Sequence, residues 1–572
     1  MTSATSQHHD RVVSSQLWAA WADALGFISE LTDEAGLRRR IGNRDLTEPL
    51  AWKRRVGGRF GVIADLPAGT YSDDTQLRLA TGRAISAQGF DVEAFAAVEL
   101  TNWPAYALGG GRASKAAAAN MTKAGNPWFG NFFKGWTEAG GNGAAMRVQP
   151  HVWAARNSDE PSSFVRAVLA NAITTHGHPR ALLGAVLHAV VLGEALRDDH
   201  APVPGSWSEM LEIAHDAIIG FEAEDAVAGV WLPAWERETG QRFRSVWEES
   251  TNECRDLLTA AKLLVTDLRA TRSQVDRDNV YEKYLDALGL RNEVTRGSGT
   301  GTVIAALALA AGCPKHPAHS AMTAARAVGT DTDTIATMAA AIAAAANPVE
   351  LPKPLQDMDY LTAEALRLAD VAAGGEPDRF AYPDLLAWSP PRSQLDVVGL
   401  AGEPAIAGLG TLTPVSYAEV YQSRDAQWAW MRADFGQTLL LKRREVLREL
   451  PPGNAPARAR SAALAIAERQ HAQVEQMLIQ QRSSCNTASV SDSTITIHDN
   501  GPGMTADELV REISRPAGSS IIDIDVILDW VRRNNFSDRA VGYAVNRVAA
   551  DGTLEQLVAL TVALRNVSRD RG

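Results

Sequence analysis

The chain has 572 residues, a formal net charge of −12, 45% apolar residues and 22% charged residues. A chain of this length is too long for one compact core and predicts roughly two to four domains. The composition is typical of a globular protein. The acidic balance argues against a general attraction to nucleic acid or to anionic membranes, although it leaves room for local basic patches.

The cysteines and the apolar segments favour a cytoplasmic protein with no membrane association. Cys254, Cys313 and Cys485 are far apart and lack Cys-x-x-Cys spacing, which argues against a disulfide framework and a zinc site. The N-terminus has no apolar signal core. The longest apolar run, near residues 335–346, is too short and too rich in Ala for a membrane span.

Helical periodicity dominates residues 14–346, where Ala and Leu recur at intervals of three and four residues. Gly or Pro closes most of these segments, as at helix ends. An all-α globule is therefore expected over residues 1–352. The clearest expected helices cover residues 16–26, 75–87, 161–174, 180–196, 207–219, 302–311 and 334–346.

Residues 109–146 interrupt this pattern with a stretch rich in Gly, Asn and aromatic residues. Long irregular segments in a compact domain are usually functional or disordered. The aromatic content argues against disorder: the stretch contains Trp128, Phe129, Phe132, Phe133 and Trp136.

The composition changes again after Pro352. Residues 353–415 are expected to be a linker or an extended wrap, because 383–414 are rich in Pro and Gly. Residues 416–572 are expected to form a smaller helical to mixed α/β region of unknown role, with helices at 417–449 and 457–481. The first of these carries Lys442, Arg443 and Arg444, which predicts a solvated face or a contact for phosphate or a protein partner.

Three segments near the C-terminus have patterns of their own. TITIHD alternates like a strand, residues 505–514 have a helical pattern, and SSIIDIDVILDWVRR is amphipathic. The motif DNGPGM at 499–504 resembles the nucleotide-binding motif of the gyrase, Hsp90, histidine-kinase and MutL superfamily. That fold needs an upstream helix with Glu and Asn, and the preceding segment offers Glu475 without a suitably spaced Asn. A turn after a strand is therefore the favoured interpretation.

Two acidic clusters, YSDDTQ at 71–76 and GTDTDT at 329–334, lie far apart in the sequence. Each combines two carboxylates with a hydroxyl, the hard oxygen ligands that Mg²⁺ prefers. One such cluster alone is more typical of a helix N-terminus. Two of them, each before an Ala-rich helical segment, indicate a divided metal site.

In their order, the segments ADALGFISE, YSDDTQL, NGAAMRV, TTHGHP, GSGTGTV and GTDTDTIA resemble the ADP-ribosylglycohydrolase family. The resemblance covers roughly residues 14–350. It implies an orthogonal helical globule, a centre of two Mg²⁺ ions for which Mn²⁺ can substitute, and hydrolysis of the glycosidic bond at C1″ of ADP-ribose.

Carried over residue by residue, the resemblance combines both acidic clusters in one set of metal ligands: Ser72, Asp73, Asp74, Asp331, Asp333 and Thr334. It places Glu30 at the family's mobile acid. It implies substrate contacts at Asp23, Gly141, Asn142, Gly143, His176, Ser298 and Gly299. The chain has Ala22 and Ser72 where the family commonly has Gly and Thr, and a Ser hydroxyl can replace that of Thr as a ligand.

Three carboxylates are candidates for the base that activates water: Asp73, Asp74 and Glu30. The linkage is left open between arginine, serine, a nucleobase and acetate, on a protein, a nucleic acid or a small molecule. The alternative function is a non-catalytic ADP-ribose-binding or interaction protein of the same fold, with the C-terminal region as a possible contact for a protein partner.

Overall fold

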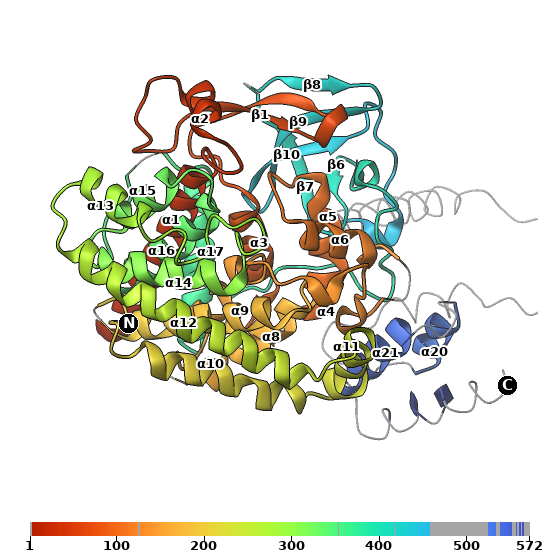
Figure 1. Ribbon diagram of the computed structural model, residues 1–572. Helices are drawn as coiled ribbons and strands as arrows, with labels where there is room; N and C mark the ends of the chain where they lie inside the picture. The colour runs from red at the N-terminus through yellow and green to blue at the C-terminus, as the bar shows by residue number, and fades with distance from the viewer. Residues whose placement is uncertain are drawn as a thin grey trace, which may run out of the picture. The chain divides into compact units, whose positions relative to one another are not determined.

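The computed structural model describes residues 3–457, except 124–125, 159, 199, 353 and 417, and farther along residues 524–533, 538–551, 556, 560–561 and 563–564. The chain divides into two compact units, Met1–Ala457 and Arg458–Gly572, which we describe separately (Figure 1).

The core of the first unit consists of apolar helices: α1 (Ser3–Gly26), α9 (Pro179–Arg197), α14 (Gly299–Gly312) and α16 (Thr332–Ala346). Helices α14 and α16 are buried along their whole length, because their short side chains let neighbouring backbones come close. In the described part of the chain, α9 is the one helix long and apolar enough to cross a membrane. The apolar stretch of this helix is 89% buried inside the protein, as expected of a core helix.

The remaining helices of this unit surround that core, and the predicted all-α fold of this region is confirmed. All seven helices named from the sequence are present; most ends shift by a few residues, but α1 begins at Ser3 and not at residue 16. The surrounding helices are α2 (Glu34–Ile41), α3 (Asp73–Arg83), α4 (Val92–Ala94), α5 (Leu100–Asn102), α6 (Arg112–Met121), α7 (Gln149–Trp153), α8 (Val165–Ile173), α10 (Trp207–Glu222), α11 (Leu232–Thr239), α12 (Phe243–Arg269), α13 (Gln274–Glu282), α15 (Pro317–Arg326) and α17 (Met358–Ala372).

Two short antiparallel hairpins interrupt the helices, and helical periodicity does not predict them. One pairs β1 (Trp52–Val56) with β2 (Val62–Leu66), so that Lys53 lies opposite Asp65. The other pairs β3 (Ile85–Ser86) with β4 (Gly89–Phe90). The first hairpin turns through Gly57 and Gly58, which both have a positive φ that glycine adopts most easily.

A six-stranded sheet follows the helices, in the order β10-β9-β7-β6-β5 with β8 paired to β9. Its strands are β5 (Val398–Leu400), β6 (Pro404–Ile406), β7 (Gly410–Pro414), β8 (Val420–Ser423), β9 (Ala426–Ala433) and β10 (Thr438–Arg443). The predictions of a linker or wrap at 353–415 and of helices at 417–449 are therefore wrong, because α17 and strands β5 to β7 lie in the first range and strands β8 to β10 in the second. The runs around Trp428 and Leu440 are aromatic and apolar strands, and Gly436, with φ +110°, turns the chain between them.

This sheet packs on the helical region through buried polar contacts. The Arg83 guanidinium pairs with Glu99 at 2.7 Å, with both side chains almost fully buried, and also donates to Gln437 from the turn between β9 and β10. The Asn102 amide donates to the Ala407 carbonyl. The first compact unit thus continues to Ala457, well beyond the boundary predicted near residue 352.

The second unit contains α20 (Ile524–Arg533) and α21 (Asp538–Asp551). Their apolar faces share a small core that includes Ile527, Val531, Ala544 and Val548. The amphipathic segment SSIIDIDVILDWVRR is helical from Ile524 on. The predicted helix beyond residue 457, the TITIHD strand, the 505–514 helix and the DNGPGM motif lie outside the described residues.

Candidate active site

The C-terminus of α1 and the N-terminus of α16 come into direct backbone contact. A Cβ at Gly26 would lie 2.5 Å from the Asp333 Cα, so this position accepts only glycine. The Thr332 hydroxyl donates to the Gly26 carbonyl at 2.8 Å. Gly26 ends α1, as its sequence context predicts, and it also brings the second acidic cluster against the first helix.

Asp23 fixes the loop that begins α3. Its two carboxylate oxygens accept from the Ser72 backbone N–H at 3.0 Å, the Thr75 backbone N–H at 2.9 Å and the Thr75 hydroxyl at 2.5 Å. Burial raises its pKa, against the lowering effect of these hydrogen bonds. The structure thus gives Asp23 a positioning role between α1 and α3, while its predicted contact with substrate stays a prediction.

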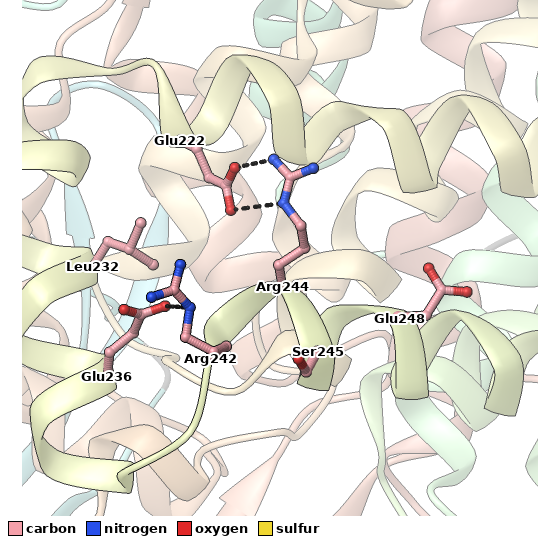
Figure 2. Close-up of a pocket in the computed structure, with 7 residues that line it drawn as sticks. All are labelled: Glu222, Leu232, Glu236, Arg242, Arg244, Ser245 and Glu248. Carbon is pink, nitrogen blue, oxygen red and sulfur yellow. Dashed lines mark hydrogen bonds and ion pairs between the residues drawn. The ribbon is translucent and has the colours of Figure 1, made fainter.

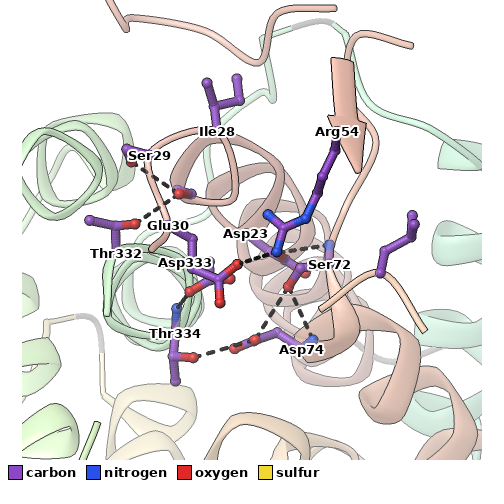
Figure 3. Close-up of polar contacts among 12 residues, drawn as sticks. Asp23, Ile28, Ser29, Glu30, Arg54, Ser72, Asp74, Thr332, Asp333 and Thr334 are labelled. Atoms are coloured by element: carbon purple, nitrogen blue, oxygen red, sulfur yellow. Dashed lines mark hydrogen bonds and ion pairs between the residues drawn. The ribbon is translucent and has the colours of Figure 1, made fainter. Parts of the chain in front are cut away.

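The two acidic clusters meet at Asp74 (Figure 3). Its Oδ2 accepts from the Ser72 hydroxyl and from the Thr334 hydroxyl, each at 3.3 Å. Its Oδ1 is buried and has no hydrogen-bond partner among the residues that the structure describes. Ser72 also caps α3 by accepting from the Asp74 N–H at 3.2 Å. The helix-cap and divided-site interpretations of YSDDTQ are therefore compatible in this structure.

The surroundings of Asp73, Asp74 and Asp333 disfavour the charged forms of these acids. Burial, with the nearby Glu30 and Asp23 carboxylates, raises the pKa of Asp73 to about 8. Burial and neighbouring acids likewise raise the pKa of Asp74 and Asp333 well above the usual range. A buried carboxylate without a partner is costly, so this arrangement suits a bound cation.

The donor set fits Mg²⁺, which binds carboxylate and hydroxyl oxygens. Asp331 begins α16 and accepts from the Asn142 side-chain amide at 3.0 Å. Among the residues described, however, no three His, Cys, Asp or Glu side chains are grouped closely enough to hold an ion. Hydroxyl ligands and small shifts of the acidic side chains would have to complete the shell of an ion.

The raised pKa of Asp73 predicts how the stability of the metal-free protein depends on pH. Its pKa is about 8 in the fold, against an ordinary value of 3.8, so the folded state binds more protons between these values. We therefore expect the stability to fall as pH rises from about 4 to about 8, by at most ~1.4 kcal/mol per pH unit for each such group. Thermal unfolding in chelator at several pH values measures this, and a stability that rises across the window would contradict it.

Glu30 lies just after α1 and is held by an arginine from the first hairpin. The Arg54 guanidinium donates to Glu30 Oε2 at 3.0 Å, and the two side chains are 17% and 13% exposed. Burial raises the pKa of Glu30, Arg54 lowers it, and Asp331 raises it further. The structure thus places the predicted catalytic acid within the electrostatic influence of both acidic clusters (Figure 3).

The predicted glycine-rich substrate loops lie against each other. Gly141 pairs with Ser298 in an isolated antiparallel bridge, and the Asn142 N–H donates to the Gly297 carbonyl at 2.9 Å. Ser298 caps α14 by accepting from the Gly301 N–H. A Cβ on Gly299 would lie 2.5 Å from the Arg180 carbonyl, so this glycine permits close packing of α14 on the start of α9.

His176 is buried beside the Asn142 loop. Its Nδ1 lies 2.7 Å from the Thr175 hydroxyl, and a Cβ on Gly143 would lie 3.0 Å from its Cε1. Burial and the nearby Arg147 lower its pKa to about 3, so the imidazole is neutral at physiological pH. A neutral ring supplies hydrogen bonding and shape, and no positive charge, to the predicted diphosphate loop.

Two buried arginines were not predicted as site residues, although both lie in the quoted motifs or directly beside them. Arg147 donates to the Gly143 carbonyl at 2.6 Å and to the Thr175 hydroxyl at 2.8 Å, which joins the Asn142 and His176 loops. Arg78 donates to Thr75 and to Thr337 and so links α3 to α16. Arg78 stands between Leu77 and Leu79, and a charged residue flanked by apolar residues is the sequence signal that points to such a role.

The first part of the irregular stretch 109–146 lies beside the acidic cluster. Gly109 has φ +126°, and a Cβ there would lie 2.3 Å from Asp73 Oδ1.

A surface cavity of about 800 Å³ between α10, α11 and α12 contains none of the predicted site residues (Figure 2). Its arginines pair with its own glutamates, Arg244 with Glu222 and Arg242 with Glu236.

The close contact at Gly26 gives a direct test of the arrangement. Gly26→Ala is expected to separate α1 from α16, because the new methyl group would overlap the backbone at Asp333. Overpacking of this kind costs about 1–3 kcal/mol of stability, and a shift of about 1 Å at the acids would lower turnover roughly 100-fold. Thermal unfolding and steady-state rates check both effects. Gly205→Ala, at a position with open space for a Cβ, is the matched control; equal behaviour of the two variants would contradict the expectation.

These observations define a helical protein with an acidic site divided between two distant segments. The chain belongs to the ADP-ribosylglycohydrolase family, whose model matches residues 4–378. The predicted resemblance is thereby confirmed.

Two known proteins are partly similar to this chain. The chain is 27% identical over 200 residues to the ADP-ribosyl-[dinitrogen reductase] glycohydrolase of Rhodospirillum rubrum, a match that spans 33% of this chain and 60% of the relative. A solved ADP-ribosylglycohydrolase-related protein complex is 21% identical, with 64% of this chain and 99% of that chain covered and a TM-score of 0.39.

Proposed function

We propose that this protein is a Mg²⁺-dependent hydrolase that removes ADP-ribose from a modified target by cleaving the glycosidic bond at C1″. One observation carries the proposal: the two distant acidic clusters meet at Asp74, where Ser72 and Thr334 donate to the same oxygen. Membership in the ADP-ribosylglycohydrolase family supports the choice of substrate.

The residues that would hold two Mg²⁺ ions, or Mn²⁺ in their place, are Ser72, Asp73, Asp74, Asp331, Asp333 and Thr334. Bound ions would neutralise the buried acids, hold the ribose hydroxyls and lower the pKa of a water. The unpartnered Asp74 Oδ1 supports this assignment, because buried oxygens without partners are rare.

The protein's own groups would supply orientation and proton transfer. Hydrolysis of a glycosidic bond passes through an oxocarbenium-like state, which nearby carboxylates stabilise electrostatically. Glu30, Asp73 and Asp74 are the candidates for the base that takes a proton from the attacking water. We favour Glu30, because Arg54 holds its carboxylate, whereas Asp73 and Asp74 belong to the proposed metal ligands.

The loops at Gly141–Gly143 and Ser298 would bind the diphosphate and the adjacent ribose. The Asn142 N–H already donates to Gly297, so anion binding there would fall to the N–H groups of the flanking glycines. Backbone N–H groups of this kind form anion-binding concavities. His176 would support the loop in its neutral form.

The test is product analysis with metal-depleted protein to which Mg²⁺, Mn²⁺ or chelator is added. Arginine-, serine- and nucleobase-linked ADP-ribose are the substrates, in water enriched in ¹⁸O, with early quenching. We expect free ADP-ribose that carries ¹⁸O, with the metal only, from at least one linkage. Release of AMP would instead indicate hydrolysis of the diphosphate bond of the ADP-ribosyl group. Tight ADP-ribose binding without release would support the non-catalytic alternative.

A further inference from the structure

The β5–β10 sheet lies outside residues 4–378, which match the family, yet it contacts the hairpin that holds Glu30. We propose that this sheet is a positioning element for Glu30. The sheet fixes the β1–β2 hairpin, and Arg54 of that hairpin fixes the Glu30 carboxylate. This inference rests on the proposed hydrolase function and assigns Arg54 and Tyr421 as positioning residues for it.

The first link joins the hairpin to Glu30. Arg54 donates to Glu30 Oε2 at 3.0 Å, and its guanidinium lies over the Phe27 ring, 4.3 Å from the centroid. A planar guanidinium held by a carboxylate and an aromatic face has little freedom to move. Figure 3 shows Arg54 extending from its strand toward the acids. The position of β1 therefore sets the position of the Glu30 carboxylate.

The loop that carries Glu30 depends on outside contacts. Arg40 donates to the carbonyls of Ile28 at 2.6 Å and Glu30 at 2.9 Å. Leu31, the next residue, has φ +48°, a conformation that is unfavourable for a leucine. Because the backbone does not favour this turn by itself, the contacts from neighbouring residues must hold it.

The second link joins the sheet to the hairpin at Asp65, which lies opposite Lys53, the neighbour of Arg54. The Tyr421 hydroxyl of β8 accepts from the Asp65 N–H at 2.9 Å and donates to Asp65 Oδ2 at 3.2 Å. The Trp430 indole N–H of β9 donates to the Asp65 carbonyl at 3.1 Å. All three polar groups of Asp65 thus have partners in the sheet.

A further contact lies at the tip of the hairpin. The Ser423 hydroxyl donates to the Phe60 carbonyl at 2.7 Å, and a Cβ at Gly57 would lie 2.5 Å from the Trp428 ring. An isolated two-stranded hairpin is only marginally stable in water. The sheet therefore supplies the support that keeps β1 and Arg54 in place.

The experiment compares the full-length wild-type protein with Arg54→Ala and with the double variant Tyr421→Phe/Trp430→Phe, which keeps an aromatic ring at both positions and removes the three hydrogen bonds to Asp65. Each change is also made in a Glu30→Gln background. Arg55→Ala is the matched control, since Arg55 is the exposed neighbour on the same strand. Steady-state kcat and KM are measured on an ADP-ribosylated substrate, and amide hydrogen exchange is measured over residues 27–31.

Arg54→Ala is expected to lower kcat roughly 100-fold with little change in KM, because a misplaced catalytic group loses rate rather than binding. The double variant is expected to lower kcat about fivefold. Neither change should lower kcat further when Glu30 is already Gln, because both act through that carboxylate. The Ser29 and Glu30 amides, which donate to the Gly26 carbonyl at 3.0 Å, should exchange faster in both variants and not in Arg55→Ala.

Each outcome bears on one claim. A wild-type protein without turnover would refute the hydrolase function. Hydrogen exchange would still test whether the sheet and Arg54 hold the loop that carries Glu30. Normal kcat and unchanged exchange in Tyr421→Phe/Trp430→Phe would overturn the role of the sheet. A further loss of kcat from Arg54→Ala in the Glu30→Gln background would overturn its action through Glu30.

Discussion

Asp333→Asn is expected to lower kcat/KM by more than about 100-fold and to make the metal-free protein more heat-stable. Removing a residue that merely orients a metal ligand typically costs about 10- to 100-fold, so losing a direct carboxylate ligand should cost more. Burial and the carboxylates of Glu30, Asp74, Asp331 and Asp23 raise the Asp333 pKa, which means that its charge opposes folding when no cation is bound. An amide removes that penalty.

Rates at limiting and at saturating Mg²⁺, with thermal unfolding in chelator, check both parts of this expectation. Asp359→Asn is the matched control, because Asp359 occupies the first turn of α17 as Asp333 does in α16 but is exposed to solvent. The control should change neither quantity. Wild-type turnover of Asp333→Asn at limiting Mg²⁺ would refute the assignment of Asp333 as a ligand.

Glu30→Gln is expected to lower kcat by about 100- to 10,000-fold, the usual contribution of a general acid or base, while ADP-ribose affinity changes only a few-fold. The amide keeps the size and shape of the side chain but cannot accept a proton. A group that acts mainly in the transition state affects turnover more than binding. Rate measurements and calorimetric titration with ADP-ribose, made in parallel, separate the two quantities.

A nearby exposed acid provides the control for this variant. Glu34→Gln changes a glutamate in the first turn of α2 without touching the site, and its kinetics should match those of the wild type. If Glu30→Gln instead weakens ADP-ribose binding and leaves kcat unchanged, then Glu30 contacts the ligand and takes no part in proton transfer.

The sequence predicts the helical core well because its signal is local. The periodic apolar residues of α9 and α16 require burial wherever these helices pack. The acidic clusters could also be paired from the sequence, since both precede such helices and both contain hydroxyls. Their contact at Asp74 depends on the close packing of α1 against α16 at Gly26. From the sequence alone, Gly26 is an ordinary helix end.

The C-terminal sheet shows where the sequence-based interpretation was wrong. The charged residues between Arg424 and Arg444 suggest a solvated helix, but Trp428 and Trp430 pack in a strand whose partner, β10, pairs with it after the turn at Gly436. Cross-strand pairing and packing depend on tertiary context. The roles of Arg54 and Arg147 likewise depend on contacts between distant segments, which no local pattern encodes.

Titration with Mn²⁺, followed by electron paramagnetic resonance of the free ion, tests most directly whether the two acidic clusters form one metal site. The samples are the wild-type protein, Asp74→Asn, Asp333→Asn and the Asp359→Asn control. We expect the wild type and the control to bind Mn²⁺ with equal affinity, and each of the other variants to lose most of that binding, because each removes a ligand from a different half of the site. Wild-type affinity and stoichiometry in either Asp74→Asn or Asp333→Asn would contradict a shared site.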